Sequence, residues 1–574
     1  MKRLLLNLIL PVLSLTASAN PISQSEALNI AKRMTAKMHK PSVALSVSNL
    51  QNEAKDRSGQ RMACPPYYAF NLDNENGFVL VSGDDQFPAI LGYSDNGQLP
   101  ASVDELPCCL RLFLDSYSEY VSDVRMGNIG APRKEHGESI GTPMMSPMIT
   151  CKWGQDTPFN LYCPSNEQRG QSIVGCVATA MAQLMYKWKW PETGTGVVSY
   201  SNAYGQIRVD FSQSTYNWSI MKNTYGALDI KKETGKAVAK LSYDCGVSVR
   251  MDYANGGSGT YTQLTIPAFY TNFRYKASTL NAITRVSCNN TREFLDHILR
   301  ELRQDRPVLF SASSTSGSGS DAGGHAFVID GYDSENFLHV NWGWNGRANG
   351  YYDVEVMDAL SYHFSEGQTI VVGIQPDYEG NDNEKPHQSR MRIIKPFSTT
   401  LVKTNVDKDF NLNLGEFYNY YPYGNKYKMG IALFDYNGQL LEVVSNIFED
   451  YLAAWSGYST YNDFVCKIPK KYDNNGYVLR IVSKQDGYDN WELADVDGGS
   501  EQNKIPVLIQ NGTVFFNQVP TAIDTIPFDE SNVTTVYYDI NGRVISDIVS
   551  HRGIVVKVDT DVNGNKRTAK IVNK

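Results

Sequence analysis

Two stretches near the start of the chain, residues 23–38 and 106–124, carry apolar residues at helical spacing. Residues three and four apart lie on one face of a helix, so this spacing predicts two amphipathic helices. Between them, residues 67–73 and 77–85 are rich in aromatic and β-branched residues and flank a turn, which predicts a hairpin. Residues 20–135 are therefore expected to form a compact α+β unit.

The pattern changes over residues 136–380. A polar stretch with glycine, proline and charges, residues 125–143, leads into this part, and its composition predicts an exposed linker that proteases can reach. After the linker, helical spacing alternates with short β-rich segments, and helices are expected near residues 230–245 and 291–303. We therefore expect a second α+β domain here.

The rest of the chain is β-rich. Residues 385–515 contain many tyrosines in alternating patterns with short turns, and they match no pattern that indicates a role. Residues 516–574 repeat a strand, an Asn-Gly turn and a second strand, which is typical of β-hairpins. These patterns predict two β-rich domains at the C-terminal end.

Residues 1–19 form a separate element. Lys2 and Arg3 precede an apolar run, and Ala17-Ser18-Ala19 follows it. A positive region, an apolar region and a small-x-small pattern are typical of a signal peptide, here with cleavage after Ala19, while the alternative is a buried N-terminal helix. No other stretch of the sequence approaches the ~18 apolar residues that a membrane helix needs. We expect an exported protein, secreted or at the cell surface, with no transmembrane segment.

Composition and charge exclude several classes of function. The chain has 574 residues, 20% of them charged, and a net charge of −8 without a basic stripe, so nucleic acid is not an expected partner. Export permits disulfides, but nine cysteines leave at least one thiol unpaired unless a second chain takes it. Because the cysteines form neither a paired CxxC motif nor a Cys/His array, no structural zinc site is expected.

One of these cysteines, Cys176, begins a helical pattern. The stretch QSIVGCVATAMAQLMYKWKWP has apolar residues at helical spacing after Gly175, and Pro191 ends it. The partial positive charge at a helix N-terminus favours a thiolate over a thiol. On this pattern alone, Cys176 is a packed core cysteine, half of a disulfide, a metal ligand or a nucleophile, and the core position is favoured.

A histidine elsewhere supplies the base that a thiol nucleophile needs. His325 follows Gly323 and Gly324 and opens an apolar strand, and a second strand after a turn ends at Asn341. In a hairpin these two strand ends share one edge, so His325 and Asn341 are expected to lie close together. The Asn amide oxygen then accepts from one ring N–H, and the other ring nitrogen faces the thiol. A histidine beside glycines is usually a turn or packing residue, but together with Cys176 this hairpin favours the nucleophile.

An acyl-transfer site also needs donors for the developing oxyanion. Gln155, in the stretch CKWGQDTPFN upstream of Cys176, can supply its side-chain NH₂ beside the backbone N–H of Cys176. Taken alone, Gln155 is more simply a surface residue. Its position in the series Gln155, Cys176, His325, Asn341 gives it the catalytic interpretation.

That order is the order of papain-like peptidases, and four segments narrow the resemblance: WGQDTPFN, VGCVATAMAQLMY, GGHAFVIDGY and HVNWGWNG. They resemble the streptopain family of bacterial cysteine peptidases. The resemblance implies an α+β, papain-like two-subdomain fold over residues 136–380. It also implies Cys176 as nucleophile, His325 as general base and acid, Gln155 in the oxyanion hole and Asn341 as the residue that orients the histidine.

The resemblance extends beyond these four positions. Trp344 matches the tryptophan that packs over the Asn–His pair in papain-like enzymes, and Trp342 is expected to line the same wall. Both tryptophans are expected to belong to the substrate site. Residues 20–135 resemble the family's inhibitory prosegment, which implies a zymogen held inactive by its own prosegment. Residues 516–574 are similar to the C-terminal sorting domains of type IX secretion cargo, which implies a contact with secretion machinery.

The expected function is therefore that of a secreted cysteine endopeptidase that hydrolyses proteins and peptides through an acyl-enzyme, with no metal or organic cofactor. Gly323 and Gly324 beside His325 let a substrate backbone approach closely, which fits recognition of an extended peptide. The alternative is a cell-surface adhesin or glycan-binding protein on an inactive peptidase scaffold, with residues 385–515 as its binding module. The complete set of four site residues favours the enzyme.

Overall fold

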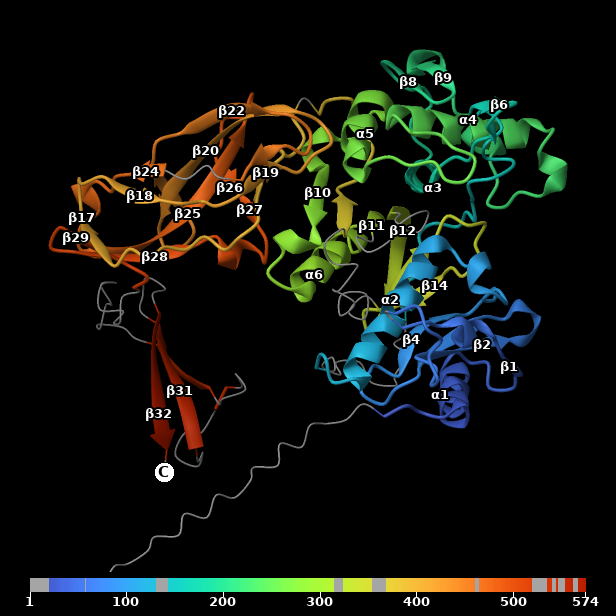
Figure 1. The fold of residues 1–574 in the computed structure, drawn as a ribbon, viewed down its shortest axis with the longest axis horizontal. Coiled ribbons are helices and arrows are strands. Elements are labelled where there is room, and N and C mark those ends of the chain that lie inside the picture. Colours follow the sequence, from blue (N-terminus) through green and yellow to red (C-terminus); the bar gives the residue numbers. More distant parts are fainter. Residues whose placement is uncertain are drawn as a thin grey trace, which may run out of the picture.

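The structure is a computed structural model that describes residues 20–56, 58–130, 143–313, 324–353, 368–382, 384–459, 464–518, 534–538, 544–545, 553–560 and 566–573. The expected signal peptide 1–19, most of the polar stretch 125–143 and Gly323 lie outside these residues. Along the chain follow an N-terminal unit, a two-subdomain unit, a β-sandwich and a small C-terminal sheet (Figure 1).

The N-terminal unit, residues 20–130, is an antiparallel meander flanked by two helices. Ser23 caps the first helix by accepting from the N–H of Glu26, and the helix buries Ala27, Ala31 and Met34 in a small core with one face of the meander. The elements are α1 (Gln24–Lys37), β1 (Leu45–Val47), β2 (Tyr67–Leu72), β3 (Phe78–Ser82), β4 (Ile90–Ser94) and α2 (Cys108–Arg125).

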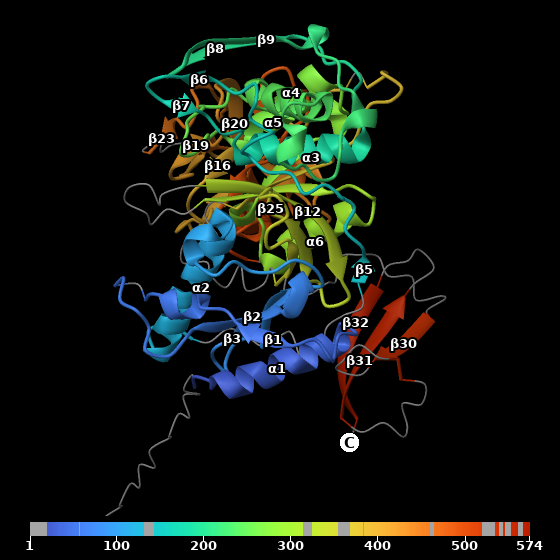
Figure 2. The same ribbon diagram turned by 90° about the vertical axis from the view of Figure 1, so that its right-hand side faces the viewer.

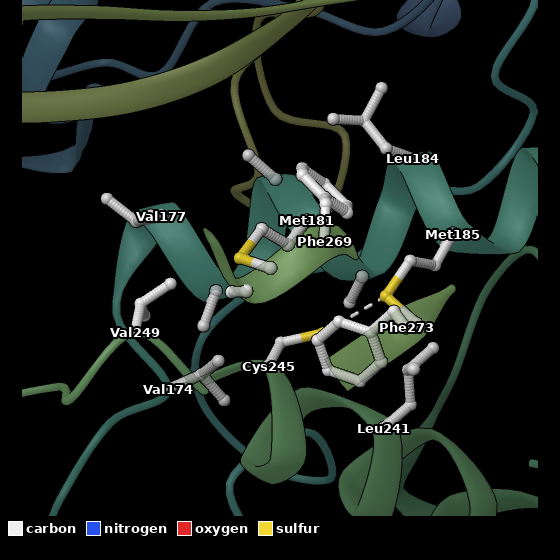
Figure 3. Close-up of a cluster of buried hydrophobic side chains, with 14 of the residues drawn as sticks. Val174, Val177, Met181, Leu184, Met185, Leu241, Cys245, Val249, Phe269 and Phe273 are labelled. Atoms are coloured by element: carbon white, nitrogen blue, oxygen red, sulfur yellow. Dashed lines mark hydrogen bonds between the residues drawn. The ribbon is translucent and has the colours of Figure 1, made fainter. Parts of the chain in front are cut away.

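The next unit, residues 143–376, consists of a helical and a sheet subdomain. In the helical subdomain, α3 (Cys176–Trp188), α4 (Glu233–Ser248) and α5 (Thr265–Phe273) surround one apolar core, in which Cys245 of α4 contacts Met185 of α3 (Figure 3). The sheet subdomain contains α6 (Thr291–Leu302). The strands of the whole unit are β5 (Pro143–Met145), β6 (Ser165–Asn166), β7 (Gly170–Gln171), β8 (Val197–Asn202), β9 (Gly205–Asp210), β10 (Asn281–Thr284), β11 (Val308–Ser313), β12 (Gly324–Asp333), β13 (Leu338–Asn341), β14 (Gly350–Tyr352) and β15 (Thr369–Val372).

A single antiparallel sheet runs through the N-terminal unit and the sheet subdomain. Its strand order is β1-β2-β3-β4-β14-β13-β12-β11-β15-β10, and β5 pairs with β12. At the seam, Gly92 and Tyr93 of β4 pair with Tyr352 and Tyr351 of β14. Gly350 permits this approach, because a Cβ there would lie 2.5 Å from the carbonyl of Tyr93. The N-terminal unit is thus joined to the second unit by backbone pairing.

Strand β12 separates two cores. Phe327 and Ile329 face a core that contains residues of α2 from the N-terminal unit and of α6. Ala326 and Val328 face the core of α3 on the other side. Figure 2 shows α2 on one side of this sheet and α3 on the other. The strand that carries His325 therefore lies between the helix of Cys176 and the N-terminal unit.

The β-sandwich, residues 391–516, packs a four-stranded sheet against an eight-stranded sheet across one apolar core. The β-rich character predicted for residues 385–515 is confirmed. The strands are β16 (Met391–Ile393), β17 (Lys403–Asn405), β18 (Phe410–Leu412), β19 (Phe417–Asn419), β20 (Asn425–Phe434), β21 (Leu440–Val443), β22 (Phe448–Leu452), β23 (Gly457–Tyr458), β24 (Phe464–Cys466), β25 (Asn475–Gln485), β26 (Glu492–Leu493), β27 (Asp495–Val496), β28 (Ile505–Gln510) and β29 (Thr513–Phe516).

The C-terminal sheet consists of β30 (Thr534–Tyr538), β31 (Gly553–Thr560) and β32 (Lys566–Asn573), paired antiparallel in chain order. It stands apart from the sandwich in Figure 1. Across all the residues that the structure describes, no helix combines the length and the apolar character needed to cross a membrane.

Candidate active site

Cys176 is the first residue of α3, and the backbone before it requires glycine. Gly175 has a φ of +90°, which residues with a Cβ rarely adopt, and an added Cβ would lie 2.7 Å from the Met251 side chain. The N–H of Val174 donates to the carbonyl of Gln155 at 2.9 Å, which ties the Gln155 loop to the start of the helix. The thiol therefore lies at the positive end of a helix dipole, beside the loop of Gln155.

The other thiols of the two subdomains differ from Cys176 in exposure. Cys176 is a free thiol, as are Cys151, Cys163 and Cys245. Burial raises the pKa of Cys151, Cys163 and Cys245, that of Cys163 to about 12, so these thiols stay protonated at neutral pH. Cys176 is only half-buried and lines a cavity. Of these four thiols, it is the one that a substrate can reach.

His325, the second residue of β12, lines the same cavity. The cavity has a volume of about 480 Å³, and its lining includes Cys176, His325 and Gly324. The Nε2–H of His325 donates to the main-chain carbonyl of Trp342 at 3.1 Å. Because a neutral imidazole carries one proton, this bond leaves Nδ1 as the basic nitrogen. The structure thus brings the predicted nucleophile and the predicted base to one cavity and fixes the tautomer of the ring.

The structure corrects the expected contact between Asn341 and the His325 ring. The amide of Asn341 donates to the carbonyl of Cys151 at 2.8 Å, and its oxygen accepts from Gln183 of α3 at 3.1 Å. The strand register explains the difference. Asn341 is the last residue of β13 and pairs with Val328 of β12. Since β12 begins four residues before Val328, it extends beyond the end of β13, and His325 lies in this extension. The loop after Asn341, rather than Asn341 itself, therefore reaches the histidine.

Gln155 and Trp344 line a second hollow, of about 210 Å³. The ring centroids of Trp344 and His325 lie 6.4 Å apart, with the rings tilted by 55°. Asn345 joins the two sides of this hollow, since its N–H donates to the carbonyl of Trp153 at 3.2 Å. The predicted oxyanion residue and the predicted packing tryptophan thus lie together, next to the histidine.

The expectation that Trp342 lines the substrate wall is wrong. Its side chain is 1% exposed, and its ring centroid lies 4.8 Å from that of Phe327 and 5.2 Å from that of Tyr352. Gly343 follows with a φ of +73°, which breaks the strand-like alternation. Trp342 therefore enters the core, while Trp344 stays at the hollow. The contribution of Trp342 to the site is its main-chain carbonyl.

Three aromatic residues that the sequence interpretation missed also line the cavity of Cys176. They are Tyr261 from the helical subdomain and Tyr420 and Trp455 from the β-sandwich. All three lie in segments between strands and helices, where no periodicity marks them. For Tyr420 and Trp455 the available signal was compositional, namely aromatic residues within turns of a domain without an assigned role.

The family model of the peptidase C10 family matches residues 153–352, and that of the Spi protease inhibitor matches residues 19–121. Streptopain from Streptococcus pyogenes is 32% identical over 337 residues, which cover 54% of this chain and 80% of streptopain. The chain belongs to the peptidase C10 family. The resemblance read from the four sequence segments is confirmed, and all four predicted catalytic positions fall within the C10 match.

Two further proteins resemble larger parts of this C10 peptidase. Thiol protease/hemagglutinin PrtT from Porphyromonas gingivalis is 30% identical over 550 residues, which cover 89% of this chain. The chain spans 58% of the length of PrtT. The solved structure of Prevotella intermedia prointerpain A is 28% identical, covers 58% of this chain and 100% of its own, and gives a TM-score of 0.46. The match to PrtT extends into the part of the C10 peptidase that forms the β-sandwich.

Proposed function

We propose that this C10 peptidase is a cysteine endopeptidase that hydrolyses proteins through a thioester with Cys176. One observation carries the proposal. The half-buried thiol at the N-terminus of α3 and the imidazole of His325 line one cavity, while neighbouring thiols are buried and protonated. A thiol nucleophile, a base of fixed tautomer and a cavity for the substrate are the parts that acyl transfer requires.

In the proposed first step, Nδ1 of His325 takes the proton of Cys176 as Sγ attacks the peptide carbonyl carbon. The carbonyl oxygen becomes an oxyanion, which accepts hydrogen bonds from the backbone N–H of Cys176 and the side-chain NH₂ of Gln155. The imidazolium then protonates the leaving nitrogen, the C–N bond breaks, and a thioester remains. In the second step, His325 deprotonates a water that attacks the thioester, and the thiol leaves with the proton.

Two residues support the base in this mechanism without touching the substrate. The Trp342 carbonyl holds Nε2–H of His325, which is the role expected of Asn341. Asn341 acts one step further away, because its oxygen also accepts from the N–H of Gly343 at 3.2 Å and so holds the loop that carries this carbonyl. We assign Asn341 a positioning role, through α3 on one side and the loop on the other.

The N-terminal unit is proposed to inhibit the enzyme until it is removed. Its match to the Spi protease inhibitor supports this role. Phe327 and Ile329, which share a strand face with His325, pack in a core with residues of α2. The N-terminal unit therefore packs against the face of β12 that also carries His325. Cleavage in the polar stretch 125–143 would release the tether and allow the unit to leave.

Export and sorting complete the proposal. The pattern of residues 1–19 supports export through a signal peptide, so the enzyme acts outside the cell or at its surface. The strand–turn–strand pattern of residues 516–574 supports a sorting role for the C-terminal sheet. The polypeptide substrates then lie outside the cell that makes the enzyme.

The test combines labelling with proteolysis. An epoxide inactivator of cysteine proteases should modify Cys176 of the processed chain and abolish cleavage of casein under reducing conditions. Cys466 offers a control, because it is a free thiol of the β-sandwich and therefore stays in the processed chain. Cys466→Ala should cleave casein at the wild-type rate, and Cys176→Ala should not cleave it. Equal casein cleavage by Cys176→Ala would contradict the proposal.

A further inference from the structure

The β-sandwich contributes two aromatic side chains to the cavity of Cys176. Tyr420 follows β19, and Trp455 lies between β22 and β23, so both come from turns at one end of the sandwich. They meet the helical subdomain at Tyr261, whose ring centroid lies 4.9 Å from that of Trp455. The rings of Tyr420 and Trp455 are perpendicular, with centroids 5.1 Å apart. We call these three residues the aromatic wall.

An arginine and its ion pair support Tyr420 in the aromatic wall. The guanidinium of Arg392 lies 4.3 Å from the ring centroid of Tyr420, a cation–π distance. Two nitrogens of Arg392 donate to the two carboxylate oxygens of Asp497, at 2.7 and 3.0 Å. Bidentate pairs of this kind have a fixed geometry, so Asp497 orients Arg392, and Arg392 supports Tyr420.

The backbone of Trp455 is strained. Its φ is +57°, in the left-handed region that bulky residues avoid. Such a conformation costs about 1–3 kcal/mol and persists where surrounding contacts enforce it, which is most common at functional sites. The indole of Trp455 packs against the rings of Tyr261 and Tyr420 and lines the cavity.

The sandwich is docked on the catalytic domain by main-chain contacts, so the wall has a fixed position relative to Cys176. The N–H of Gly498 donates to the carbonyl of Val286 at 2.9 Å, and the N–H of Glu501 donates to the side chain of Asn289 at 2.8 Å. These contacts join the two domains next to α6, in the sheet subdomain. The aromatic wall joins them at Tyr261, in the helical subdomain.

The chemistry of the cavity points to the kind of side chain that it takes. Its described lining contains no Asp, Glu, Lys or Arg. Beside His325 the lining has the small residues Ala312, Gly324 and Ala326, and the three rings of the aromatic wall also line the cavity. Most of the other lining side chains are polar but uncharged, namely Ser258, Thr260, Thr262, Gln263, Ser311 and Thr369. Small residues leave room and aromatic rings supply apolar contact area, which together suit a large uncharged side chain.

We propose that Tyr420 and Trp455 are specificity-determining residues of the peptidase, and that they select polypeptide substrates with an aromatic or large apolar side chain near the scissile bond. The inference rests on the proposed function and adds to it a role for the β-sandwich. The sandwich is then part of the substrate site.

The experiment uses the full chain after it has processed itself, with active thiols counted by an epoxide inactivator. Fluorogenic peptides carry either Phe or Gln at each of the four positions before the scissile bond in turn. For the position at which the wild type most prefers Phe, Trp455→Ala should lower kcat/KM for the Phe peptide about tenfold and change that for the Gln peptide less than twofold, since single pocket contacts discriminate by about that much. Tyr420→Ala should act in the same direction, and Trp455→Phe should retain most of the preference.

Tyr436→Ala is the matched control. Tyr436 is a 51% exposed aromatic residue of the same sandwich. It follows Phe434 at the end of β20, and the other end, Asn425, pairs with Leu452 near Trp455. Ten residues of strand put these two ends roughly 30 Å apart. Tyr436→Ala should keep the wild-type ratio of Phe to Gln peptides.

Three results would overturn the inference. If the wild type cleaves the peptides and Trp455→Ala keeps the same preference, the aromatic wall does not select substrates, although the proposed function stands. If Trp455→Ala raises kcat/KM for both peptides alike, the wall is a steric barrier. If the wild type neither cleaves any peptide nor reacts with the inactivator, the proposed function fails, and the inference fails with it.

Discussion

Tyr93 donates a buried side-chain hydrogen bond across the seam between the N-terminal unit and the catalytic domain, and Tyr93→Phe removes that bond alone. The Tyr93 hydroxyl donates to Oδ2 of Asp333 at 2.8 Å, and the Tyr93 side chain is 5% exposed. Oδ1 of Asp333 already accepts from the N–H groups of Glu335 and Phe337. The substitution keeps the ring, which stacks on Tyr351 at 5.2 Å, and removes only the hydroxyl.

The size of the effect follows from the charge and burial of this contact. A hydrogen bond to an ionised group contributes about 1.5–3 kcal/mol, and a buried acceptor without its donor loses at least that much. At about 1.4 kcal/mol per tenfold, Tyr93→Phe should weaken the binding of the N-terminal unit about 10- to 150-fold. The backbone pairs at Gly92 and Tyr93 remain, so docking should be weakened and not abolished.

The assay needs a chain that cannot cut itself and a linker that can be cut at will. A recognition sequence for a site-specific protease is inserted within residues 131–142 of Cys176→Ala, the purified chain is cut, and the dissociation constant of the labelled N-terminal unit is measured by fluorescence anisotropy. Tyr68→Phe is the control. The hydroxyl of Tyr68 donates to the carbonyl of Ile22 at 3.0 Å, wholly within the N-terminal unit.

A dissociation constant for Tyr93→Phe within twofold of the parent would refute the reasoning, because the buried bond would then contribute no net affinity. Equal weakening by Tyr68→Phe would also refute it, because the loss would then reflect a less stable N-terminal unit. A double-mutant cycle with Asp333→Asn separates the pair from its surroundings, and its coupling term should account for most of the loss.

Three further predictions concern processing, pH and the start of α3. Cys176→Ala should remain uncut between residues 125 and 143 when purified alone, and active enzyme added in trans should trim it; trimming without added enzyme in a protease-deficient host would rule out self-processing. Burial raises the pKa of Asp333, whereas the hydrogen bond from the Tyr93 hydroxyl lowers it, so this bond favours the ionised carboxylate. The loss of docking affinity caused by Tyr93→Phe should therefore grow as pH rises through the titration of Asp333, and a loss that is the same at every pH would contradict this. Gly175→Ala should lower kcat about 5- to 150-fold, since a left-handed backbone strains a residue with a Cβ by about 1–3 kcal/mol and the added Cβ meets Met251. An unchanged kcat per titrated thiol would show that the helix start tolerates a side chain.

The sequence located the parts of the site that depend on local pattern. Cys176 begins a helix because apolar spacing starts there, and His325 opens a strand because glycines precede an alternating run. Both positions follow from a few neighbouring residues. The helices near 230–245 and 291–303 were predicted for the same reason, and α4 and α6 confirm them within a few residues.

The contact of Asn341 could not be predicted in the same way, because it depends on strand register. The interpretation assumed that the two strands of the hairpin end together. In the structure β12 has ten residues and β13 has four, and a bulge between Ile329 and Gly331 shifts the pairing. Relative strand length and bulges are set by packing against the rest of the sheet, which local sequence does not record.

Contacts between distant segments could not be predicted from the sequence either. The pairing of β4 with β14 and the reach of Trp455 to the cavity of Cys176 join residues that are hundreds of positions apart. No periodicity connects such segments. The short helix α5 escaped for another reason, since its residues are largely apolar and lack the polar face that marks an amphipathic helix.

The seam at β14 also affects how the peptidase acquires its fold. During synthesis the N-terminal unit emerges first, and it offers a finished strand edge and an apolar face on which the later strands can assemble. Once the unit is removed, β14 becomes an unpaired edge strand, and Phe327, Trp342 and Tyr352 lose a covering layer. The processed enzyme is therefore expected to stay folded because it unfolds slowly, and to aggregate when it is denatured and then diluted from denaturant. The unprocessed chain carries its own folding template and should refold in higher yield.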